Sequence, residues 1–141
     1  MLTTRETTSP ACACISSSSR RSVIDYIDDG LRRRRRPPLA SVGQPVRDDD
    51  GRLAQFSVDV HEGVVRDVVF SASSCATLIA YCELIASEAV GLTPHEVESA
   101  VEPARVVALL NNIPPDKRAV STLAVAAFFR ALTAANQGDP R

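Results

Sequence analysis

The sequence is poor in several residue types, and each shortage excludes a class of protein. It has no tryptophan and only 4% aromatic residues, so we do not expect a surface that stacks the bases of single-stranded nucleic acid. Four cysteines are too few for a small scaffold held together by disulfides. Two histidines exclude a multi-histidine metal site. No run approaches the roughly 18 consecutive apolar residues of a membrane span, which excludes an integral membrane protein.

What is present is typical of one globular domain with an uneven distribution of charge. The 141 residues are 45% hydrophobic and 23% charged, and a domain averages roughly 150 residues. Residues 1–36 hold eight arginines and four acids, a net charge of +4, whereas residues 37–141 hold eight basic and 13 acidic residues, a net charge of −5. A basic segment therefore precedes an acidic body, which bears on partners rather than on the fold.

Residues 1–38 are predicted to be a disordered arm rich in serine and arginine, in which Cys12 and Cys14 have no assigned role. Val23–Asp29 favours one or two helical turns that end at Gly30. Arg32–Arg36 and the two prolines after it indicate an extended, solvated linker, because like charges repel and proline stops a helix. The alternative is a patch for nucleic acid or an anionic surface. A nucleic-acid partner is the less favoured reading, because no aromatic residue is interleaved.

The folded body is predicted over residues 39–136, before a polar tail at 137–141. Phe56–Val60 alternates apolar and polar residues, and Val64–Ala72 follows after a short turn, so the two segments form antiparallel strands. Helical spacing then begins after Cys75 and stops at Gly91, and shorter helices follow after Thr93 and at Ala104. Pro114 and Pro115 open a last helix with one apolar stripe. This order predicts an α+β fold in which a small antiparallel sheet is packed on one face by helices.

Cys75 is the best-placed reactive side chain, because it lies where the second strand gives way to a helix. Free N–H groups at a helix start stabilise a thiolate, which can accept sulfur, act as a nucleophile or bind a metal. The alternative is a small buried side chain. Cys82 lies seven residues later, about 10 Å along the helix, too far to share a metal or a disulfide with Cys75. We therefore expect Cys82 in the core. His61 and His95 are both expected on the surface.

Several segments in order resemble the U-type iron–sulfur cluster scaffold proteins, the group of IscU, SufU and the NifU N-terminal domain. Val42–Pro45 is similar to the family's Val-Gly-Ala-Pro, and Gly63–Phe70 to its Gly-Ile-Ile-Glu-Asp-Ala-x-Phe. The spacing from Gly63 to Cys75 matches the family's spacing to its second cysteine. Ile113–Lys117 is similar to Leu-Pro-Pro-Val-Lys, and Val120–Ala124 follows in register like Cys-Ser-x-Leu-Ala.

The resemblance implies a cluster site of three cysteines and an aspartate, with a histidine beside the last cysteine. In this sequence the positions hold Arg47, Asp49, Cys75, Ala119 and Val120. Asp49 and Cys75 are therefore the implied ligands for iron, or for zinc, while Arg47, Ala119 and Val120 are departures. One thiolate and one carboxylate do not complete the four ligands of a [2Fe–2S] cluster. Any transient iron–sulfur cluster would take further ligands from Cys12, Cys14, glutathione or a second copy.

The resemblance implies iron–sulfur cluster assembly without enzymatic turnover, with Cys75 accepting sulfur or binding iron and a cysteine desulfurase as partner. It also implies a contact with an Hsp70-type chaperone through the residues Ile113, Pro114, Pro115, Asp116 and Lys117. One alternative is a degenerate paralogue that binds the desulfurase or chaperone without chemistry. A second is anionic-surface or nucleic-acid binding through Arg32–Arg36. The expected location is the cytoplasm, or the mitochondrial matrix if the source is eukaryotic, and a homo-oligomer is possible.

Overall fold

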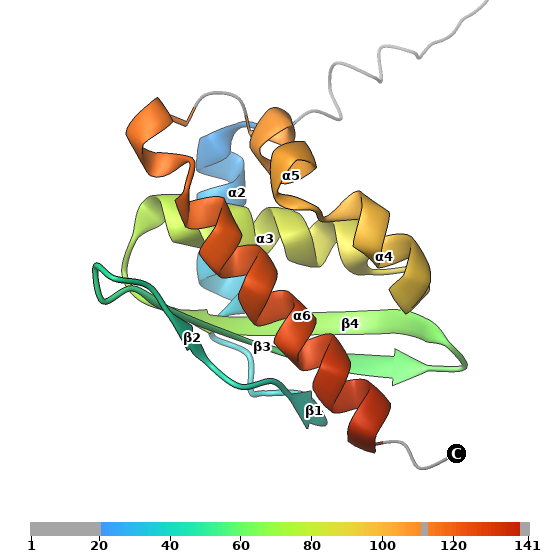
Figure 1. Cartoon of the computed structure of the whole chain (residues 1–141). Coiled ribbons are helices and arrows are strands. Elements are labelled where there is room, and N and C mark those ends of the chain that lie inside the picture. The colour runs from blue at the N-terminus through green and yellow to red at the C-terminus, as the bar shows by residue number, and fades with distance from the viewer. Residues whose placement is uncertain (1–20, 111–112, 139–141) are drawn as a thin grey trace, which may run out of the picture.

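A computed structural model describes residues 21–110 and 113–138, with side chains described as far as residue 136. The fold is α+β: an antiparallel sheet carries a layer of helices (Figure 1), which confirms the predicted fold class. Cys12 and Cys14 lie outside the described residues. The elements, in chain order, are α2 (Val23–Arg33), β1 (Ser41–Val42), β2 (Val46–Arg47), β3 (Leu53–His61), β4 (Val64–Ala72), α3 (Ala76–Ala89), α4 (Pro94–Ala100), α5 (Pro103–Leu109), a 3₁₀ turn (Pro115–Lys117) and α6 (Val120–Gly138).

The long hairpin of β3 and β4 is the centre of the sheet. β4 has the predicted bounds, whereas β3 contains the predicted strand and extends beyond it at both ends. The turn between them uses Glu62 and Gly63, both with positive φ. The short strands β1 and β2 both pair antiparallel with β3. Since β4 occupies one edge of β3 along its length, β1 and β2 follow one another along the other edge.

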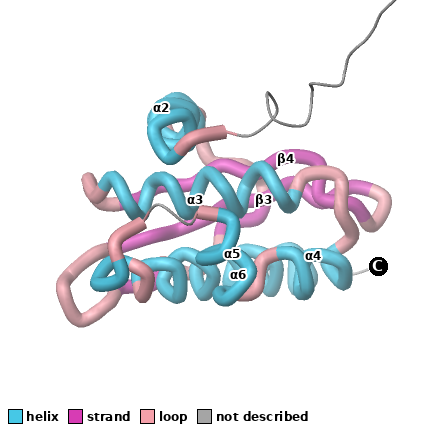
Figure 2. The backbone as a smooth tube through the Cα atoms, turned by 90° about the horizontal axis from the view of Figure 1, so that it is seen from above, coloured by secondary structure: helices cyan, strands magenta, loops and turns pink. Residues whose placement is uncertain are grey.

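The helices α3 and α6 lie side by side over one face of the sheet, and α2 packs on α3 beside the β4 edge (Figure 2). Inward side chains of the hairpin meet α6: the ring centroids of Phe56 and Phe128 are 5.3 Å apart, and those of Phe56 and Phe70 are 5.7 Å apart. The alternation along β3 determines which side chains enter the core, since its even-numbered residues face the helices and its odd-numbered residues face away. The core therefore forms between the sheet and the helical layer, as the period-two pattern predicts.

The helix starts agree with the sequence except at the last one. The helix α4 begins after Thr93, as predicted, and Thr93 caps it with a capping box in which Glu96 returns the bond. Pro114 and Pro115, predicted to open the last helix, instead lead into a 3₁₀ turn, with the N–H of Lys117 bonded to the carbonyl oxygen of Pro114. The α-helix proper begins at Val120.

The prediction that a helix ends at Gly30 is wrong, because α2 runs on to Arg33. Gly30 is buried against α3, and a Cβ at that position would lie 2.7 Å from Cγ2 of Ile79. The glycine therefore serves a close approach between two helices rather than a helix end. Ser22 begins α2 with a capping box closed by Asp25. A helix thus stands inside the range that the sequence assigns to a disordered arm.

The arginine run is also not a solvated linker, because most of its side chains bind the rest of the molecule. The guanidinium of Arg33 donates to the carbonyl oxygen of Val68 at 2.8 Å, and that of Arg34 to Ala72 at 3.1 Å. Arg36 forms an ion pair with Asp67. The repulsion between the arginines is offset by these contacts, which only the tertiary structure supplies.

We call residues 34–40 the strap, because this segment crosses the sheet face that points away from the helices. The N–H of Leu39 donates to Oγ of Ser57 at 2.9 Å. Ser57 and Val69 both point to this outer face, yet each is only 3% exposed. The chain therefore passes from α2, around the β4 edge, to β1 on the opposite edge (Figure 1).

Among the described residues, the segment Pro115–Asn136 is long and apolar enough to span a membrane by length and composition alone. Its apolar stripe packs on β3 and α3, and 56% of its most apolar window is buried inside the fold. Core packing accounts for its composition.

Candidate functional site

Cys75 is the N-cap residue of α3, as its place between strand and helix predicts. Its backbone is extended, with φ −120° and ψ 114°, and its side chain makes no capping hydrogen bond. The carbonyl oxygen of Cys75 accepts from the N–H of Ile79 at 2.9 Å, which starts the helix. The thiol is half-buried, so it is held by the fold and still within reach of solvent.

The loop between β2 and β3 carries three consecutive aspartates and turns tightly at Gly51, which has φ +84°. Asp48 organises this loop by accepting from the backbone N–H groups of Asp50 at 3.0 Å and Arg52 at 2.8 Å. Desolvation acts to raise the pKa of Asp48, but these bonds and the Arg52 guanidinium outweigh it and hold the pKa below its usual value. The Asp48 carboxylate is therefore a fixed negative charge at the base of the loop.

Arg52 binds two aspartates of this loop, and the sequence did not predict it as part of the site. Its Nη1 lies 3.0 Å from a carboxylate oxygen of Asp48 and 3.0 Å from one of Asp50. Interactions with Asp48, with the Cys75 thiol and with Asp50 raise the pKa of Arg52 above its usual value. The local sequence offers one sign of this role, an arginine that follows three consecutive aspartates and a glycine. The approach of Arg52 to Cys75 depends on the pairing register of β3 and β4, which the local sequence does not show.

The acidic hollow, as we call it, lies against this loop and has a volume of about 220 Å³. It is lined by Asp48, Asp49, Asp50, Arg52, Asp116, Ala119 and Val120. The structure thus brings Asp49 together with Ala119 and Val120, three of the positions that the family resemblance singles out. Arg47 is exposed on β2, and neither Arg47 nor Cys75 is among the residues that line the hollow.

The donors among the described residues do not by themselves suit an iron–sulfur cluster. Within residues 21–110 and 113–136, no three side chains of histidine, cysteine, aspartate or glutamate gather at metal-binding distance. Four soft ligands are what a [2Fe–2S] cluster requires. Arg52 adds a cation bound to two of the nearby carboxylates. An iron–sulfur cluster, as cargo, would need donors from outside the described residues.

The segment of Ile113 to Lys117 borders the same hollow. Ile113 is 4% exposed and anchors the segment in the core, and its carbonyl oxygen accepts from Nε of Arg118 at 3.3 Å. Pro114, Pro115 and Asp116 are exposed. Since Asp116 also lines the hollow, a partner bound to this segment would lie beside the loop that carries Asp49.

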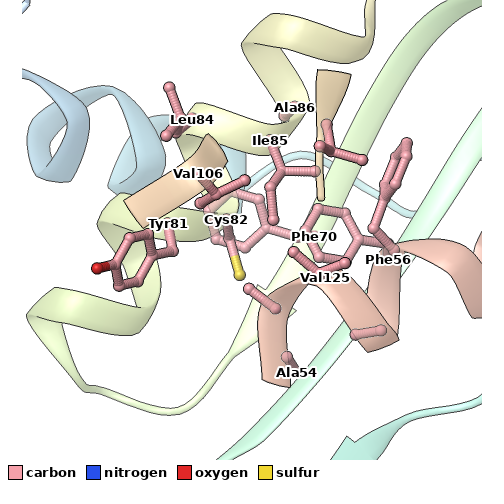
Figure 3. Packing of buried hydrophobic residues seen from close by; sticks show 14 of the residues in the cluster. Ala54, Phe56, Phe70, Tyr81, Cys82, Leu84, Ile85, Ala86, Val106 and Val125 are labelled. Carbon is pink, nitrogen blue, oxygen red and sulfur yellow. The ribbon is translucent and has the colours of Figure 1, made fainter. Parts of the chain in front are cut away.

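Cys82 is fully buried, as predicted. Figure 3 shows its sulfur pointing into the apolar cluster, toward the helix that carries Val125. Burial raises the pKa of the Cys82 thiol well above its usual value, so this thiol stays neutral and unreactive. His61 and His95 are exposed, also as predicted.

Comparisons with known proteins agree with this fold. Residues 27–137 match the family model described as the NifU-like N-terminal domain. A NifU-like protein (N-terminal) from Brucella abortus has a similar structure, with a TM-score of 0.58 and 17% sequence identity, over 84% of this chain and 100% of that chain. No curated protein matches the chain significantly.

A second similar structure is a protein from Fervidobacterium islandicum AW-1, described as an iron–sulfur cluster assembly scaffold for the SUF system. Its TM-score is 0.58 at 14% identity, over 78% of this chain and 93% of that chain. At these identities the two structures establish the fold alone. The family model covers more than three quarters of the 141 residues, and on that match the chain belongs to the NifU-like N-terminal domain family of iron–sulfur cluster assembly.

Proposed function

We propose that this protein takes part in iron–sulfur cluster assembly by accepting sulfur on Cys75. The observation that carries the proposal is the half-buried thiol at the start of α3 beside the Arg52 guanidinium, in a chain of this family. A persulfide is an anion, and a guanidinium together with free N–H groups at a helix start stabilises a negative charge. Sulfur acceptance needs one such thiol, whereas cluster construction needs several ligands.

The proposed step is a transfer between two sulfur atoms. The Cys75 thiolate attacks the outer sulfur of a persulfide on a cysteine desulfurase, and the S–S bond of that persulfide breaks. The desulfurase recovers a thiolate and Cys75 becomes the persulfide, so charge and electrons balance. A later partner removes the sulfur, and the chain itself turns over no substrate. Asp49, exposed at the rim of the acidic hollow, is the proposed first contact for iron.

Mass spectrometry tests this function directly. The full chain with Cys12→Ser and Cys14→Ser would be mixed, without air, with a cysteine desulfurase and cysteine, then alkylated and digested. We expect one added sulfur atom on the peptide that holds Cys75, which disappears in a further Cys75→Ala variant. Cys82→Ala is the matched control and keeps the added sulfur. An unmodified Cys75 peptide would overturn the proposal.

Adding ferrous iron to the same mixture tests whether an iron–sulfur cluster forms. With iron and glutathione present, we expect visible absorbance and acid-labile sulfide that Cys75→Ala abolishes and Asp49→Asn reduces. If glutathione is left out, the signal should weaken, because the described residues supply too few donors. A signal that is independent of Cys75 would contradict its role as acceptor.

A second candidate function is partner binding without sulfur chemistry. It is favoured by the exposed Pro114, Pro115 and Asp116 in a segment similar to a chaperone-binding motif, next to positions that lack the family's other ligands. Pull-down with an Hsp70-type chaperone and with a desulfurase tests it. The variant Pro115→Ala with Lys117→Ala should release the chaperone. Retention of neither partner by the unmodified chain would count against this function.

Binding of an anionic surface through Arg32–Arg36 finds less support. Arg33, Arg34 and Arg36 donate to groups of the same molecule, and Arg32 pairs with Asp29. Arginines occupied in this way have fewer donors left for phosphates.

A further inference from the structure

A second hollow lies on the outer face of the sheet, between the strap and β1, away from the acidic hollow. Its volume is about 220 Å³. Its walls come from the strap, β1 and the hairpin of β3 and β4. The residues that line it are Arg34, Arg36, Pro38, Val42, Gln55, Phe56, Ser57, Val69, Phe70 and Ser71.

The charged residues that line this hollow are both arginines. Arg34 and Arg36 line it, and none of the described lining residues carries a carboxylate. Arg36 is already paired with Asp67. Arg34 is half-buried and uses Nη1 for the carbonyl oxygen of Ala72, which leaves its other N–H groups for a ligand. The hollow therefore attracts an anion at the end where Arg34 lies.

The rest of the wall is mainly apolar. Val42 is 45% exposed, which is high for a large aliphatic side chain, and Pro38 and Val69 complete the apolar surface. Ser71 is exposed and adds a hydroxyl group. A binding site with apolar walls and a few polar groups is typical of small-molecule pockets. The ligand that fits such walls has an apolar body as well as an anionic head.

Size limits the ligand further. An engineered apolar cavity of about 150 Å³ accepts benzene, so a hollow of about 220 Å³ accepts a body of about six to eight carbon atoms. A carboxylate suits the planar fork of a guanidinium, which binds it through two parallel hydrogen bonds. We propose that the outer-face hollow binds a small monocarboxylate of this size, with its head on Arg34 and its chain against Val42 and Val69.

The test uses the full chain, labelled with ¹⁵N, and hexanoate as the probe. Two-dimensional NMR titration should shift the amide signals of Leu39, Ser57, Val69 and Ser71 in a saturable way. Hexanol and hexylammonium test the head group and should bind at least about tenfold more weakly, as expected when a hydrogen-bonded charge pair is absent.

Variants locate the binding site. Arg34→Gln should weaken hexanoate binding about tenfold or more, and Arg34→Lys, which keeps the positive charge, should restore part of it. Arg35→Gln is the matched control, since Arg35 is exposed and does not line the hollow. The spread of the amide signals in the same spectra reports whether each variant is folded.

Three results would overturn the proposal. The first is the absence of saturable shifts at the lining residues of the unmodified chain. The second is equal affinity of folded Arg34→Gln and Arg35→Gln for hexanoate. The third is hexanol binding as tightly as hexanoate, which would mean that the guanidinium contributes nothing.

Discussion

Glu83 shows how much a single residue decides in this fold. It lies within an apolar helix and is 2% exposed, yet its carboxylate receives Nε of Arg33 at 2.7 Å and Nη2 of Arg21 at 3.1 Å. Ser87 donates a further bond at 3.0 Å. A buried carboxylate is tolerated only when it is paired and hydrogen-bonded, so Glu83 ties α2 to α3.

Replacing Glu83 by Gln should therefore be costly. The variant leaves the Arg33 guanidinium, only 20% exposed, without its counter-charge, and we expect the free energy of unfolding to fall by about 2–3 kcal/mol. Urea unfolding followed by circular dichroism measures it. Glu88→Gln is the control on the same helix, because Glu88 is 35% exposed and its nearest guanidinium nitrogen lies 4.0 Å away. Equal effects of the two variants would contradict the role of Glu83.

The Arg36–Asp67 pair makes stability depend on pH in the acid range. The hydrogen bond from Arg36 holds the pKa of Asp67 below its usual value, although burial acts in the opposite direction. A depressed carboxyl pKa stabilises the fold above the unfolded-state value of about 3.9, and this contribution is lost as pH falls through the folded-state value.

Asp67→Asn should therefore lower the free energy of unfolding at pH 7 by about 0.5 kcal/mol, a value kept small because both side chains are about a third exposed or more. The difference from the unmodified chain should shrink as the pH is lowered below about 4. Urea midpoints across pH 2.5 to 7 measure this. A difference that stays constant with pH would show that the charge is not its source.

At this scale the sequence predicted what local pattern controls. Cys75 stands at the strand-to-helix junction, and Cys82 is buried, because both follow from the period of the segments around them. Arg52 and Glu83 escaped prediction, since each depends on partners from distant parts of the chain. No local sequence pattern predicts that Glu83, inside a helix, is paired with Arg21 and Arg33.

At the scale of elements, the close contact of β1 with α6 depends on Gly43. A Cβ at this position would lie 2.4 Å from the backbone nitrogen of Ala131, and a helix backbone cannot move aside as a flexible side chain does. The N–H of Gly43 also bonds the carbonyl oxygen of Phe56 at 2.9 Å. The absence of a side chain therefore sets the distance between the sheet edge and the last helix.

Gly43→Ala should lower the free energy of unfolding by about 2–3 kcal/mol through overpacking. Gly51→Ala is the comparison: its positive φ is strained for alanine, but nothing lies within 4 Å of the added Cβ, so we expect about 1 kcal/mol. Thermal and urea unfolding measure both. A larger loss for Gly51→Ala would mean that backbone strain, not contact, dominates.

The elements differ in how far sequence predicted them. The second strand, Val64–Ala72, has the predicted bounds, because alternation and turn residues fix it locally. The helix α2 extends past the glycine that should end it, since packing on Ile79 outweighs the helix-weakening tendency of glycine. The strap was also not predicted, because arginines repel each other in isolation and are held here by acceptors on β4 that lie far away in the sequence.

At the scale of the whole molecule, α2 and the strap belong to the folded unit, and the family model accordingly begins at residue 27. Removal of residues 1–38 would leave Glu83 without its arginines and would uncover Ile79 and the outer face at Val69. We expect a loss of about 5 kcal/mol, the lower end of a typical domain stability of 5–15 kcal/mol. Removal of residues 1–20 should leave the free energy of unfolding nearly unchanged.

Urea unfolding of the two shortened chains beside the full chain tests this prediction. Hydrogen exchange at β4 adds a local measure, because loss of α2 exposes that strand. If the chain without residues 1–38 unfolds at the same midpoint as the chain without residues 1–20, the boundary near Leu39 read from the sequence is the better one.

The arginines that bind the open edge of β4 also restrict how one copy of this protein can join another. Because the carbonyl oxygen of Phe56 points to Gly43, just after β1, the partner Phe70 and its neighbours Val68 and Ala72 direct their backbone groups to the open edge of β4. Arg33 and Arg34 occupy the oxygens of Val68 and Ala72 there. A strand edge covered in this way offers no template for another strand. A sheet that runs on from one molecule to the next is therefore hindered along the β4 edge.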